Sequence, residues 1–97
     1  MATYIVLANF TEQGIHNVRD TTKRADVFMD LAKTFGATVK DIHWTLGRYD
    51  IICTVEAPDD VSATALGLTL GKSGNVRTET LRAFSYDEMA AILAKVL

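Results

Sequence analysis

Two neighbouring segments of the sequence alternate with a period of two and are separated only by a glycine and an arginine. Residues 38–46 and 49–56 show the alternation of apolar and polar residues that is typical of half-buried β-strands. Gly47 and Arg48 lie between them, and a two-residue connection that begins with glycine is typical of a type II′ hairpin. The sequence therefore predicts a β-hairpin, and its register decides which side chains share a face of the sheet.

Counting outward from the predicted turn gives that register. If Leu46 pairs with Tyr49, both strands sort into the same two faces. The pairs on the apolar face are Trp44 with Ile51, Ile42 with Cys53 and Lys40 with Val55. The pairs on the other face are Thr45 with Asp50, His43 with Ile52, Asp41 with Thr54 and Val39 with Glu56. A slip of one residue would destroy this agreement, so we expect Trp44 and His43 on opposite faces.

The rest of the chain predicts two more strands and three helices. The expected strands are residues 3–10 and 76–84, and the expected helices run from Asp20 or Thr21 to Gly36, from Asp59 to Gly71 and Gly74, and over residues 85–97. The buried stripe of the second helix should contain Val61, Ala65, Leu66 and Leu70, and that of the third Met89, Ile92, Leu93 and Val96. Ser85 and Glu88 match a capping box.

This order of elements is that of an α+β, ferredoxin-like βαββαβ fold with an added C-terminal helix. We expect a single domain over residues 1–97, with a four-stranded antiparallel sheet and the helices on one face. The first and third strands should be central, which agrees with the apolar character of residues 3–10 on both sides.

Helices on one face leave the other face of the sheet uncovered. Tyr4, Val6 and Ala8 should point one way, and Ile5 and Leu7 the other. Apolar area left in water costs about 25 cal/mol per Å², and contiguous exposed patches usually mark an interface. We therefore expect a homodimer or larger homo-oligomer in which sheets meet face to face. The space between them should be lined by His43, Thr45, Asp50 and residues of the fourth strand.

Composition limits the classes of partner and compartment. The net charge is −2 and the basic residues are scattered, so we expect no nucleic-acid partner and no membrane partner. The single cysteine, Cys53, excludes an internal disulfide and fits a reducing compartment. No apolar run approaches the ~20 residues that span a bilayer, and the first residues lack the basic region of a signal peptide. We expect a cytoplasmic protein without metal or cofactor.

The hairpin also carries a family signature. The sequence LGRYD at residues 46–50 resembles the glycine–x–tyrosine–aspartate motif of the GYD domain family, and residues 41–45, 56–60 and 74–84 are similar to that family as well. The resemblance implies a ferredoxin-like chain of the dimeric α+β barrel type. It implies no single activity, because related barrels include cofactor-free monooxygenases, dehydratases, small-molecule sensors and haem enzymes.

His43 and Asp50 are the candidate catalytic residues. In the expected register they are diagonal neighbours at ~7 Å between backbones, where an imidazole oriented by a carboxylate could act as a general base. Alternatively, Asp50 accepts hydrogen bonds from backbone N–H groups near the turn or from the Thr45 hydroxyl. A metal site of His43, Asp41 and Asp50 is a further alternative, although their spacing matches no recognised ligand signature.

The candidate ligand-binding residues are Thr45, Arg48, Thr78, Thr80 and Arg82. Arg48 either clamps an anion or is solvated at the tip of the turn. The three residues of the fourth strand alternate together, and they either line a polar cavity or form the surface of an edge strand.

Three residues on the apolar face of the hairpin have structural interpretations. Trp44 and Tyr49 should pack against the helices, with stacking on a ligand as the alternative. Cys53 should be a buried thiol with no base beside it.

Three accounts of function follow. The first is a small GYD-type homo-oligomer that binds a small molecule in a pocket over the sheet face. The second is a cofactor-independent enzyme in which His43 and Asp50 handle a proton. The third is an oligomer of packed sheets with no pocket. The enzyme requires His43 and Asp50 in contact inside a cavity that excludes water, whereas the binding protein tolerates their replacement.

Overall fold

A four-stranded sheet and four helices make up the chain, and the computed structural model describes all residues 1–97. The strands are β1 (Ala2–Phe10), β2 (Thr38–Trp44), β3 (Ile51–Ala57) and β4 (Val76–Ala83). The helices are α1 (Glu12–His16), α2 (Thr21–Thr34), α3 (Asp60–Lys72) and α4 (Tyr86–Leu93), with a 3-10 helix η1 at Val18–Asp20. The sheet order is β2-β3-β1-β4 and all neighbours are antiparallel, which confirms the ferredoxin-like α+β fold.

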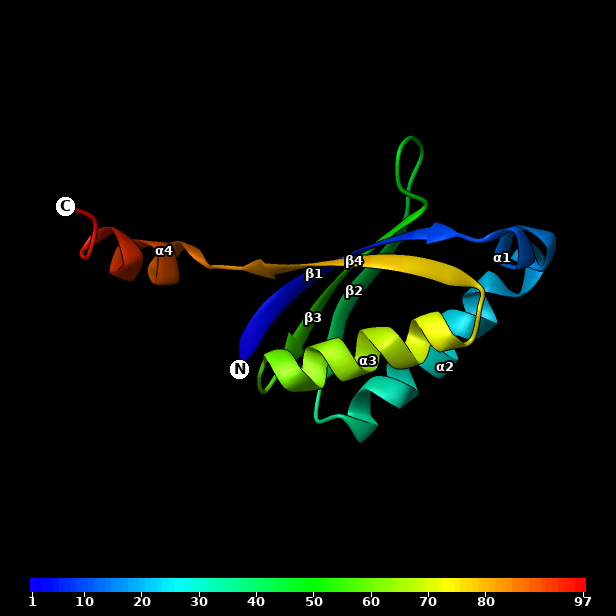
Figure 1. Ribbon diagram of the computed structural model, residues 1–97, viewed down its shortest axis with the longest axis horizontal. Coiled ribbons are helices and arrows are strands. Elements are labelled where there is room, and N and C mark those ends of the chain that lie inside the picture. Colours follow the sequence, from blue (N-terminus) through cyan, green and yellow to red (C-terminus); the bar gives the residue numbers. More distant parts are fainter.

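The core lies between the sheet and the pair α2 and α3, which cover one face of it (Figure 1). Tyr4 and Ala8 of β1 are buried on this side, while the alternate residues Ile5 and Leu7 face away and stay partly exposed, as the alternation predicts. Val55 of the central strand β3 is almost completely buried. No helix has the length and apolar character that crossing a membrane would require.

Most helix ends follow the signals in the sequence, although Asp20 precedes α2 without a capping hydrogen bond from its side chain. Gly36 adopts a φ of +72° after α2, and Gly74 a φ of +89° after α3, conformations that favour glycine. The Asp59 carboxylate accepts from the Ser62 N–H at 2.8 Å and caps α3. The hydrogen bonds of the capping box at Ser85 are both present on α4.

The buried face of α3 differs from the predicted stripe. Val61 is 79% exposed, whereas Ala63 and Leu66 are buried. Gly71 also lies inside the helix, which ends at Lys72. The prediction for Val61 was wrong because α3 turns its Ala63–Leu66 side toward the sheet, and small residues there let the helix approach closely.

The predicted register of the hairpin is confirmed for residues 41–44 and is wrong for the earlier residues of β2. His43 pairs with Ile52, and Trp44 with Ile51, as predicted. A β-bulge then shifts the register, so that Val39 pairs with Val55 instead of Glu56. Because of the extra residue in the bulge, the Val39 side chain packs against the core. Strict alternation would have placed it on the other face of the sheet.

The expected two-residue turn is replaced by a longer loop. β2 ends at Trp44 and β3 begins at Ile51, so residues 45–50 project beyond the sheet (Figure 1). Leu46 and Tyr49 do not pair; the backbone bond across the base runs from Thr45 N–H to the Asp50 carbonyl at 2.8 Å. Gly47 still supplies the left-handed conformation, with a φ of +105°. The prediction of a II′ turn was therefore wrong in length but correct in its need for glycine.

Gly14 offers a test of how closely α1 packs on the loop before β4. A Cβ atom at this position would lie 1.9 Å from the Asn75 carbonyl oxygen, which belongs to the backbone and cannot easily move. We expect Gly14→Ala to lower the free energy of unfolding by about 1–3 kcal/mol in urea denaturation. The matched control is Gly71→Ala, where nothing lies within 4 Å. It should raise stability by about 0.5–1 kcal/mol because alanine favours a helix interior. Equal unfolding midpoints for the two variants would contradict this account.

Candidate functional site

Asp50 anchors the loop of residues 45–50 to the end of β1. Its N–H donates to the Ala8 carbonyl at 2.9 Å, and its Oδ2 accepts from the Phe10 N–H at 2.9 Å. The carboxylate thus takes the place of a backbone acceptor beyond the last paired residue of β3. Of the two interpretations of Asp50, the structure supports acceptance from a backbone N–H.

Tyr49 lies on the face of the sheet that the helices leave uncovered, called here the open face. Its hydroxyl approaches the Glu79 carboxylate at 3.4 Å. Glu79 pairs with Leu7, whose side chain points away from the helices. The prediction that Tyr49 shares the apolar face with Trp44 was wrong, because the longer loop turns Tyr49 across β1. Sequence reasoning missed Glu79 as its partner, since no local pattern links positions 30 residues apart.

His43 is also on the open face, exposed and opposite Ile52. No hydrogen bond or ion pair joins it to Asp50, whose carboxylate is turned to Phe10. Asp41 instead accepts from the Thr54 N–H at 3.2 Å. No three His, Cys, Asp or Glu side chains gather closely enough to hold a metal ion. Acid–base catalysis by His43 and Asp50 stays a prediction.

The candidate ligand-binding residues are divided between the two faces of the sheet. Thr78, Thr80 and Arg82 pair with Ala8, Val6 and Tyr4, so they point toward the helix side. Thr78 and Thr80 lie beside Gly67 of α3, in an open polar groove of about 600 Å³ between α3 and β4. Thr45 donates its hydroxyl to the Tyr49 carbonyl at 2.6 Å. Arg48 is exposed in the loop, with its guanidinium 5.8 Å from the Tyr49 ring centroid. These five residues do not form one site within a single chain.

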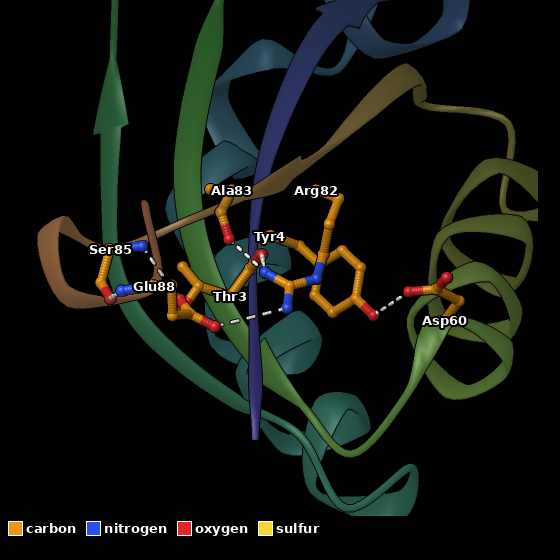
Figure 2. A network of polar contacts seen from close by, with 7 residues as sticks. All are labelled: Thr3, Tyr4, Asp60, Arg82, Ala83, Ser85 and Glu88. Carbon is orange, nitrogen blue, oxygen red and sulfur yellow. Dashed lines mark hydrogen bonds and ion pairs between the residues drawn. The ribbon is translucent and has the colours of Figure 1, made fainter. Parts of the chain in front are cut away.

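Arg82 joins the end of β4 to the start of α4 (Figure 2). Its guanidinium donates to the carbonyls of Thr3 and Ala83, and it pairs with Glu88 at 3.5 Å. It also lies over the Phe84 ring at 4.6 Å. The hydrogen bond from the Ser85 N–H, more than the nearby guanidinium, holds the pKa of Glu88 below its usual value. Arg82 is thus engaged by its own chain.

Tyr4 connects this network to α3. Its hydroxyl donates to the Asp60 carboxylate in the first turn of the helix, and its ring lies 5.7 Å from the Arg82 guanidinium (Figure 2). The hydrogen bond to Asp60 raises the pKa of Tyr4, and the coulombic effect of the same carboxylate acts in the same direction.

Cys53 is buried on the helix side, as predicted. Burial raises the pKa of its thiol to about 11, and the negative charge of Asp41 adds to the effect. The thiol is therefore protonated at neutral pH and a poor nucleophile.

The chain exposes more surface than a compact monomer of its mass would expose. The accessible surface is 6676 Å², against about 5,500 Å² for a compact monomer of this mass. The radius of gyration is 14.5 Å, against about 12.5 Å for a compact chain of this length. α4 contributes to the extended shape, because it lies beyond the end of the sheet and has no buried residue (Figure 1). The open face is a second uncovered region.

Replacing Asp50 tests whether its carboxylate holds the loop. Asp50→Ala leaves the Phe10 N–H without its acceptor, so we expect a loss of about 1–2 kcal/mol in the free energy of unfolding. Asp50→Asn keeps an acceptor oxygen and should lose less. Arg48→Ala is the control in the same loop and should change stability by less than about 0.5 kcal/mol. Urea denaturation measures all three, and wild-type stability of Asp50→Ala would refute the anchor.

Comparison with known proteins connects this geometry to a family. A protein of Thermus thermophilus, described as glutamine synthetase and cystathionine beta-lyase binding protein, is 33% identical over 94 residues, which are 96% of this chain and 99% of that protein. The family model of the GYD domain matches residues 4–93 and includes the loop with Tyr49 and Asp50. The resemblance seen in the sequence is confirmed, and the chain belongs to the GYD domain family.

Proposed function

We propose that this protein is a small protein-binding module that associates with copies of itself and binds a second, larger protein. The observation that carries the proposal is its uncovered surface, about 1,200 Å² more than a compact monomer of its mass would expose. A standard interface buries about 800 Å² on each partner. The excess is therefore large enough for one stable interface, which we assign to self-association; the binding of a larger protein is supported by the description of the Thermus relative.

The open face is the surface proposed for self-association. Its centre is apolar, with Ile5, Leu7, Ile52 and the 43% exposed Leu81 from three adjacent strands. Charged residues of both signs surround this centre, namely Asp41, Glu56, Arg77 and Glu79. An apolar centre with a mixed polar rim is typical of an interface, and a two-fold axis would bring each patch against its own copy. His43 would then lie between the two sheets, where the sequence places its candidate pocket.

α4 is the second surface that we propose for self-association. Met89 and Leu93 are exposed on its apolar stripe, with Val96 just beyond its end. A helix as short as Tyr86–Leu93 is not stable alone in water, even with a capping box, because its few hydrogen bonds do not offset the cost of nucleation. Packing of the stripe against a second copy would supply the missing contacts.

The loop of residues 45–50 is the surface proposed for the larger partner. It projects from the sheet (Figure 1), and Asp50 fixes its base. The Leu46 side chain is fully exposed, and Arg48, two positions later, adds an exposed cation. Arginine is enriched among the residues that dominate the binding energy of interfaces, and this anchored loop presents Arg48 close to an exposed apolar side chain. The description of the Thermus relative indicates the class of partner, a metabolic enzyme such as glutamine synthetase or cystathionine beta-lyase.

Sedimentation analysis tests the proposed self-association. The wild-type chain should sediment as a dimer or larger species at micromolar concentration. Leu81→Glu places a charge in the centre of the open face and should weaken association by about tenfold or more. Leu68→Glu is the matched control, because Leu68 is 71% exposed on the outer side of α3. A monomeric wild-type protein, or equal dissociation of the two variants, would refute the assignment of this face.

Binding to purified enzymes tests the second part of the proposal. The protein should bind glutamine synthetase or cystathionine beta-lyase of its own organism in biolayer interferometry. Leu46→Asp and Arg48→Asp should each weaken binding by about tenfold. Val61→Ser, on the exposed side of α3, should leave it unchanged. Absence of binding to both enzymes would reject this class of partner, and wild-type affinity of the loop variants would reject the loop.

A further inference from the structure

An apolar cavity of about 260 Å³ lies on the helix side of the sheet, opposite the open face. Its floor is formed by Val6 and Cys53 of the central strands, and its roof by Ala25, Phe28 and Leu31 of α2. The cavity is partly open to solvent, and an apolar space of about 150 Å³ is already large enough to bind benzene. The space is therefore large enough for a small organic molecule.

The rim of the cavity contains polar side chains and one positive charge. Arg24 is the only charged residue in its lining, and no carboxylate faces it there. The Arg24 guanidinium donates to the carbonyls of Asn17 at 2.8 Å and Gly14 at 3.5 Å, which fixes its position. A guanidinium has five N–H donors, so further donors are left for a ligand. A fixed cation above an apolar space is complementary to a carboxylate on an apolar body.

We propose that this cavity binds a small hydrophobic carboxylic acid, with its aromatic or short-chain body between the sheet and α2 and its carboxylate at Arg24. The proposal goes beyond the protein-binding role and is independent of it, because the cavity lies on the other side of the sheet from the open face.

The chain contains its own probes of this site. Its single tryptophan, Trp44, lies at the rim, 42% exposed, and its indole N–H donates to the Thr21 hydroxyl at 3.0 Å. Its single cysteine, Cys53, lies in the floor. A ligand in the cavity should change the fluorescence of Trp44. It should also slow the modification of Cys53 by a small neutral thiol reagent at alkaline pH, where enough of the otherwise protonated thiol is ionised to react without ligand.

The full-length protein is titrated with phenylacetate and octanoate, and with the neutral analogues phenylacetamide and octanamide. We expect saturable changes in Trp44 fluorescence, about tenfold tighter binding of the acids than of the amides, and protection of Cys53 at saturation. Arg24→Gln should remove the preference for acids and keep the affinity for the amides. If this variant fails to fold, Arg24→Lys, which keeps the charge, should retain the preference. Ala25→Leu, which fills part of the cavity, should weaken binding of acids and amides alike.

Three outcomes would overturn the proposal. Equal affinity for acids and amides in the wild-type protein would reject the role of Arg24. Absence of any fluorescence change or protection of Cys53 would reject the cavity as a ligand site. Binding that Ala25→Leu leaves unchanged would place the ligand elsewhere. None of these results depends on whether the protein self-associates or binds an enzyme.

Discussion

The burial of one face of the sheet under α2 and α3 is the interaction on which the rest of the structure depends. Val55 and Tyr4 are at its centre, on the two central strands. Because side chains alternate along a strand, every residue buried there leaves a neighbour on the other face. The chain has no further helix over that face, since α4 lies beyond the end of β4 (Figure 1). The bare sheet face is thus a direct consequence of the core, whereas α4 is bare because it lies beyond the end of the sheet.

The two faces also separate two kinds of chemistry. The open face and the anchored loop present apolar and charged groups to the outside, as a protein-binding surface requires. The helix side holds a protonated thiol and an apolar cavity with a single fixed cation, Arg24, at its rim. The loop lies on the same side as the open face, because the Asp50 carboxylate accepts a hydrogen bond from β1 while the Tyr49 hydroxyl contacts Glu79 on that face.

The candidate site was only partly predictable. The alternation around Gly47 correctly put His43 and Trp44 on opposite faces. Aspartate near a turn often accepts hydrogen bonds from backbone N–H groups, and this tendency correctly predicted the role of Asp50. No pattern in the sequence indicated on which face of the sheet Thr78 and Thr80 lie, because β4 is an edge strand with polar residues on both faces. Only its pairing with β1 assigns them to the helix side.

Local periodicity and short-range hydrogen bonds were enough to predict the order of the four strands and the three longer helices, the caps at Asp59 and Ser85, and the pairing of residues 41–44 with β3. They did not predict α1 or η1. The bulge beside Val39, the length of the loop after Trp44 and the direction in which α4 leaves the sheet could not be predicted in this way. Each of these is settled by contacts between segments far apart in the chain, or by their absence. A local pattern contains no information about such contacts, because the energy of packing is gained only when the distant partner is in place.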